Sequence, residues 1–106
     1  LGIPADPLFR SASIKHLMQL CDNAMTHMIG VLNDVPQIDV NRTLNFENEI
    51  NDYRKLLKEK NVADIESQKY SYQIGVHYMD IVNDCEKLGD YIVNVVEAHA
   101  NRRLSV

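Results

Sequence analysis

A chain of 106 residues with 45% hydrophobic and 25% charged residues has the size and balance of one globular domain, which excludes the disordered and fibrous classes. Its formal net charge of −4 argues against a nucleic-acid surface, because phosphate contacts need clustered Lys and Arg. The apolar runs are far shorter than the roughly 20 residues of a membrane span, and no signal peptide is present.

The first predicted helix begins where Asp6 is followed by Pro7. Asp accepts the free amide hydrogen bonds of a helix N-terminus, and Pro fits the first helical position. Apolar residues then repeat with heptad spacing and form one stripe along one face. The members of this stripe are Ile14, Leu17, Met18, Cys21, Ala24, Met25, Met28, Val31 and Leu32. The segment 33–36 should close the helix, because the residue before Pro36 disfavours helical geometry.

A second helix is expected to begin between residues 36 and 41 and to end at about residue 60. Its thinner apolar stripe alternates by four and three and consists of Phe46, Ile50, Tyr53 and Leu57. The segment 61–64 is predicted to be a short turn, in which Asn61 ends this helix or caps the next one.

The third and longest helix is predicted from about Val62 to about Asn101. Its stripe alternates by four and three through Ile74, Tyr78, Ile81, Cys85, Leu88, Ile92 and Val95. Gly89 in mid-helix costs about 1 kcal/mol relative to Ala, so it should mark the close approach of a neighbouring helix.

These elements predict one all-α domain over residues 1–106, an antiparallel three-helix bundle, because short connections force neighbouring helices to run antiparallel. The third helix, at roughly 55–60 Å, is longer than the other two can cover. Its extra apolar surface is expected to form an interface in a homodimer or a larger assembly, built through the third and first helices. The alternative is that the same surface faces a membrane part of the protein that precedes this chain.

Acidic residues are densest on the third helix, at Asp80, Asp84, Glu86 and Asp90. Glu86 and Asp90 are four residues apart, so their carboxylates share one helix face. Carboxylates one turn apart repel each other, and a hard cation with oxygen ligands relieves that repulsion. The alternative is that these acids simply face water.

Enzyme motifs are missing from the sequence. A di-metal oxidase needs Glu-x-x-His pairs, zinc sites often use His-x-x-x-His or Cys-x-x-Cys, and phosphate loops need clustered glycines; none occurs here. The chain is therefore predicted not to be an enzyme, and no catalytic residue is assigned. The remaining enzymatic hypothesis is a metal-dependent helical bundle that uses the acids at 80–90.

The two cysteines, Cys21 and Cys85, lie within apolar stripes and lack the spacing of metal ligands. We expect both to be small buried residues in a reducing compartment. The chain begins at Leu1 rather than Met, as expected for a domain excised from a longer protein or for a processed product.

The segment 78–94 resembles the signature helix of the PhoU family, an Asp-Leu-Glu-Arg-Ile-Gly-Asp core followed one turn later by Asn. The matching residues are Asp84, Glu86, Gly89, Asp90 and Asn94. Cys85 and Lys87 depart from the pattern. The segment 46–58 is similar to the middle helix of the same family.

Standalone members of that family carry two three-helix repeats, whereas this chain has the length of one. A single repeat resembles the C-terminal cytoplasmic domain of bacterial sodium/phosphate cotransporters of the type II family, in which a membrane transporter precedes the bundle. The resemblance implies a regulatory domain for phosphate uptake on the cytoplasmic side of an inner membrane. Its partner would be the transporter portion of the same chain. The alternative is a standalone phosphate-signalling adaptor of one repeat.

PhoU relatives bind metal clusters through Glu/Asp-x-x-x-Asp motifs on adjacent helices. Carried over by resemblance, Glu86 and Asp90 match the motif of the third helix. Glu47 and Asn51, on a polar edge of the second helix that also holds Arg54, would be the counterpart, and Asp84 a lesser member. A cation bound there should be oxygen-ligated, such as magnesium, calcium, manganese or iron. No other cofactor is expected.

Overall fold

The computed structural model describes residues 7–69 and 71–104, and the side chains from 11 to 101 within those ranges. Its elements in chain order are α1 (Pro7–Leu32), the 3-10 helix η1 (Val40–Arg42), α2 (Thr43–Glu66) and α3 (Tyr72–Leu104). The described residues contain no β-strand. The predicted three-helix bundle is confirmed, with α3 the longest at 33 residues. Asp6, the predicted N-cap of α1, lies outside the described residues, although α1 does begin at Pro7.

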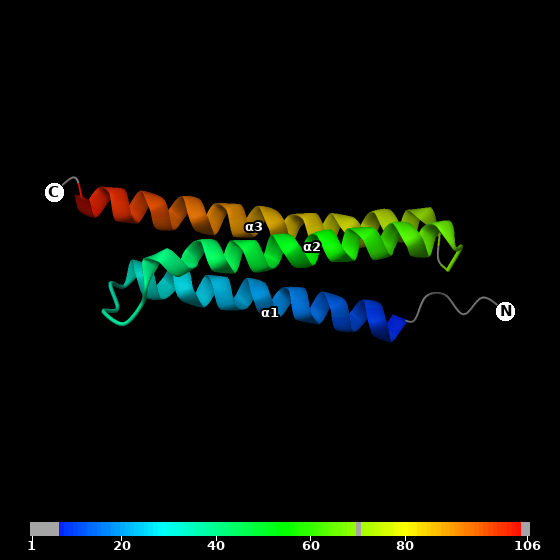
Figure 1. Ribbon diagram of the computed structural model, residues 1–106, viewed down its shortest axis with the longest axis horizontal. Helices are drawn as coiled ribbons and strands as arrows, with labels where there is room; N and C mark the ends of the chain where they lie inside the picture. Colours follow the sequence, from blue (N-terminus) through cyan, green and yellow to red (C-terminus); the bar gives the residue numbers. More distant parts are fainter. Residues whose placement is uncertain (1–6, 70, 105–106) are drawn as a thin grey trace.

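The bundle is a rod that measures 64 × 20 × 16 Å. The helix α2 runs antiparallel to α1 and α3, so α1 and α3 run parallel to each other (Figure 1). Each helix contacts the other two. The α1–α2 connection and the C-terminal part of α3 lie at one end of the rod, and the α2–α3 turn lies at the other (Figure 1).

The core follows the axis that the three helices share. Its buried apolar residues are Leu17, Cys21, Ala24, Val31, Ile50, Leu57, Tyr78, Val82, Cys85, Ile92 and Val96. Both cysteines are thus buried, as predicted. Gly89 lies against α2, as expected, because a Cβ at this position would be 3.4 Å from Cδ1 of Ile50.

The predicted turn at residues 61–64 is wrong. The helix α2 continues to Glu66, and the chain turns at Ser67, with Gln68 at a φ of 57°. Asn61, which suggested a helix end, is instead buried at the contact with α3. Asn61 donates its Nδ2 hydrogen to the carbonyl oxygen of Gly75 in α3, at 3.1 Å.

The buried carboxylate of Asp64 is held between two lysines. Its Oδ1 lies 3.8 Å from Nζ of Lys60 and 3.6 Å from Nζ of Lys69. Lys60 belongs to α2 itself and Lys69 to the turn that follows it, so Asp64 stabilises the C-terminal end of α2, whereas Asn61 stabilises the α2–α3 contact. Side chains that often end a helix can lie within one when such partners satisfy their hydrogen-bonding capacity.

Candidate functional site

A polar cluster lies between α2 and α3, on the side predicted to hold a metal. Nε of Arg54 in α2 lies 2.8 Å from Oε2 of Glu86 in α3. The same guanidinium donates from Nη2 to Oδ1 of Asn51, at 3.1 Å. The Arg54 side chain is 17% exposed and that of Glu86 is 33% exposed, so the pair is partly shielded from water.

The contact between Arg54 and Glu86 is an ion pair without a well-directed hydrogen bond at Nε. Although Nε of Arg54 and Oε2 of Glu86 are close, the buried Nε hydrogen has no hydrogen-bond partner among the residues that the structure describes. The attraction is therefore mainly between the two charges, and Asn51 orients the guanidinium from its own helix.

The five residues predicted to bind metal do not all gather at this cluster. Glu86 and Asn51 belong to the cluster, because both contact Arg54. Glu47 lies against α3, and its Cγ is 3.9 Å from the place that a Cβ at Gly89 would occupy. Asp90 is exposed. Asp84 is also exposed and, two residues before Glu86, lies on roughly the opposite side of the helix.

Arg54 brings a positive charge to the position where the predicted site needs a cation. The sequence correctly placed Arg54 on the polar edge of the second helix, with Glu47 and Asn51, but did not reveal its pairing with Glu86. Among the described residues, no three His, Cys, Asp or Glu side chains lie close enough together to hold a metal ion. A cation that used Glu86 would have to displace the guanidinium, and the metal site stays a prediction.

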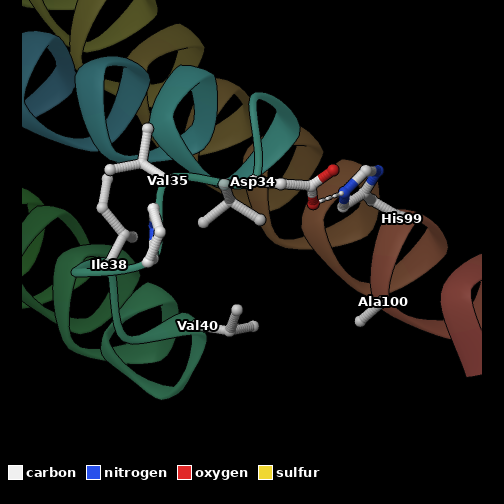
Figure 2. A pocket seen from close by; sticks show the side chains of 8 residues that line it. Asp34, Val35, Ile38, Val40, His99 and Ala100 are labelled. Carbon is white, nitrogen blue, oxygen red and sulfur yellow. Dashed lines mark hydrogen bonds and ion pairs between the residues drawn. The ribbon is translucent and has the colours of Figure 1, made fainter.

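A cavity of about 690 Å³ opens at the end of the bundle where α1 meets the connection to α2 (Figure 2). Its lining is mostly aliphatic and consists of Val31, Asp34, Val35, Pro36, Ile38, Val40, His99 and Ala100. At the rim, Nε2 of His99 in α3 lies 3.0 Å from Oδ1 of Asp34, which follows α1. Among the residues that the structure describes, no Ser or Cys lines the cavity, so none of them offers the His–Asp pair such a nucleophile. The sequence alone did not point to this cavity, because it forms only where the segment 31–40 meets His99 and Ala100, which are far away in the chain.

Apolar side chains form long rows on α1 and on α3, beside the contact between these two helices. Sγ of Cys21 lies 4.0 Å from the carbonyl oxygen of Cys85, which identifies the sides of the two helices that face each other. Beside these positions, apolar residues recur at every seventh position on each helix. Side chains seven positions apart lie in one line along a helix. We call the following set the apolar face: Met18, Met25, Leu32, Ile74, Ile81, Leu88 and Val95.

Most of the apolar face is accessible to water. Met18 is 56% exposed and Ile81 is 48% exposed, and Leu32, Ile74 and Val95 are also exposed. Met25 and Leu88 are partly buried against the core. The broad stripe predicted for the third helix therefore contains two rows: one fills the core, and the other faces outward beside the α1–α3 contact.

None of the helices in the described part of the chain is long and apolar enough to cross a membrane. The model of the PhoU domain family matches residues 14–98, most of the chain and all three helices of the bundle. No curated protein and no solved structure gives a significant match. The PhoU family is one of regulatory, non-enzymatic domains. Its match over this length shows that the chain belongs to the PhoU domain family.

Proposed function

We propose that this PhoU domain is the cytoplasmic regulatory domain of a sodium-dependent phosphate cotransporter, and that it acts through protein contacts. Family membership supports a regulatory role in phosphate signalling. The observation that carries the proposal is the apolar face, because exposed apolar surface of this extent usually marks a protein interface.

The contact that we propose for the apolar face is a second copy of the same domain. The rod is 64 Å long and 20 Å wide, so one long side can supply the roughly 800 Å² per partner of a standard interface. In a two-fold arrangement, each copy would cover the Met18 and Ile81 rows of the other. This dimer would unite two three-helix repeats, the number expected for standalone relatives.

The test measures sodium-dependent uptake of radiolabelled phosphate by cells that express the whole reading frame containing this domain. We compare the wild type with Ile81→Glu, which places a charge on the apolar face. As a control we use Leu56→Glu, since Leu56 on α2 is 57% exposed and lies outside that face. We expect Ile81→Glu to change how uptake responds to external phosphate, and Leu56→Glu to leave the response intact.

Two outcomes would contradict the proposal. One is an uptake response that is identical in the wild type and in Ile81→Glu. The other is a reading frame without several apolar segments of about 20 residues, which would favour the standalone adaptor instead. In that case the same two variants can be compared in a phosphate-starvation reporter assay.

A further inference from the structure

The core contains a pair of thiols that the regulatory role does not use. Cys21 in α1 and Cys85 in α3 are free cysteines, 5% and 8% exposed. Sγ of Cys21 lies 4.0 Å from the carbonyl oxygen of Cys85, so the two residues are in contact across α1 and α3. They are 64 residues apart in the chain, so only the folded bundle brings them together.

The packing around the two cysteines allows α1 and α3 to approach closely. Ala24 follows Cys21 by about one turn and is buried. Small side chains permit short distances between helix backbones. A disulfide requires such proximity, with Cα atoms about 4.4–6.8 Å apart.

The environment keeps the Cys21 thiol protonated at neutral pH. Burial, and to a lesser degree the neighbouring Cys85, raises the pKa of the Cys21 thiol to about 12. Catalytic dithiols show the opposite shift, towards a lower pKa. Cys21 therefore becomes a good nucleophile only when α1 moves briefly away from α3 and water reaches the sulfur.

We propose that Cys21 and Cys85 form an intramolecular disulfide between α1 and α3 when the protein meets a peroxide. A thiolate exposed by local opening attacks hydrogen peroxide, which gives a sulfenic acid and, after protonation of the released hydroxide, one water. When the helices close again, the second thiol attacks the sulfenic sulfur, the S–S bond forms, and a second water leaves. Two thiols are oxidised by two electrons in total, and one peroxide is reduced to two waters.

The disulfide would be a reversible covalent cross-link between α1 and α3, the two helices that carry the apolar face. It constrains the unfolded chain across a long loop, which raises the melting temperature of the oxidised protein. In a reducing compartment the disulfide would be transient, because cellular thiols would reduce it. This inference does not depend on the proposed function, because it concerns only the interior of the bundle.

The experiment treats the reduced protein with hydrogen peroxide, alkylates the remaining thiols under denaturing conditions, and measures intact and peptide masses. We expect a monomer that has lost two hydrogen atoms, one cross-linked peptide pair joining Cys21 to Cys85, and full reversal by dithiothreitol. The melting temperature should rise by several degrees. Urea below the unfolding transition should speed the reaction severalfold, since it populates open states.

Cys21→Ser and Cys85→Ser serve as matched controls, each with one thiol left, and neither should lose two hydrogen atoms. The wild-type masses decide the question even if a variant folds poorly. Two free thiols after peroxide treatment, with and without urea, would overturn the proposal. The proposal would also be overturned if peroxide only added oxygen atoms to the two cysteines without linking them, or if disulfides formed only between molecules.

Discussion

His27 in α1 and Thr43 at the start of α2 form a buried hydrogen bond in which the histidine is the donor. Nε2 of His27 lies 2.8 Å from Oγ1 of Thr43, and that hydroxyl donates its own hydrogen to the carbonyl oxygen of Val40 at 2.7 Å. The hydroxyl has one hydrogen, so the imidazole must donate from Nε2. This pair attaches the beginning of α2 to α1.

The pairing of His27 predicts that acid weakens the bundle. Burial lowers the pKa of His27 below 6.5, and the nearby Arg42 guanidinium lowers it further, while Asp39 opposes them weakly. The unfolded chain, with an ordinary histidine pKa, therefore takes up a proton more readily than the folded chain. Stability should fall as pH decreases from about 7.5 through 6.5 towards the lower folded-state pKa.

Urea denaturation at several pH values measures this effect. His27→Gln keeps a donor for Thr43 but cannot titrate, so the loss of stability between about pH 7.5 and about pH 5.5 should be smaller in this variant. His77→Gln, at an exposed position on α3, is the control and should keep the wild-type slope. Equal slopes in His27→Gln and the wild type would show that His27 does not govern the response.

Removing the guanidinium from the α2–α3 cluster should destabilise the bundle. Arg54→Met leaves the Glu86 carboxylate partly shielded without its partner, at a cost of about 1–2 kcal/mol, between the values for exposed and buried pairs. Adding Glu86→Gln should recover part of this loss, because the unpaired charge is then absent. Urea denaturation of the single and double variants, with exposed Lys55→Met as control, measures both steps. No recovery in the double variant would mean that the pair is not coupled.

The same substitution tests the predicted metal site. Arg54 occupies the neighbourhood of Glu86, so Arg54→Met should bind manganese more tightly than the wild type does in calorimetric titration. The affinity should decrease as pH falls through the carboxylate range, since ligands must be ionised. Adding Glu86→Gln and Asp90→Asn to the Arg54→Met variant should abolish the heat of manganese binding. If Arg54→Met gives no binding heat, these acids are a solvated surface.

The apolar face should determine the oligomeric state. We expect sedimentation to show a dimer for the wild type, and a shift to monomer for Met18→Glu, which would place a charge in the proposed interface. Leu56→Glu is a matched control, because Leu56 is 57% exposed and Met18 is 56% exposed, and it should remain dimeric. A wild-type monomer at high micromolar concentration would contradict the proposed contact between copies.

Two glycines in α3 should respond to alanine in opposite ways. A Cβ at Gly75 would overlap the side chain of Ile65, so Gly75→Ala should destabilise the bundle by about 1–3 kcal/mol. At Gly89 the nearest atom, on Ile50, is 3.4 Å away, which is an ordinary contact. Gly89→Ala should therefore raise stability by up to about 1 kcal/mol through better helix propensity. Thermal melting of the two variants distinguishes these effects, and a stabilising Gly75→Ala would disprove the packing argument.

The sequence by itself determined the number of helices and their order, and it showed that the third helix is the longest. This was possible because the signals are local: an apolar residue every three or four positions, Pro7 at a helix start, and Pro36 after a helix end. The same periodicity indicated that both cysteines would be buried. The resemblance of residues 78–94 to the PhoU signature was also readable from the chain, because it depends only on the order of residues.

The tertiary structure alone decided which of these residues meet. Asn61 looked like the end of a helix, but its partner is the carbonyl oxygen of Gly75 on another helix. Glu86 looked like a metal ligand, and the structure pairs it with Arg54. Likewise, the outward row that includes Ile81 has the same spacing as the core row beside it. Local spacing cannot distinguish these cases, because charge neutralisation and burial depend on neighbours that are brought close only when the three helices pack.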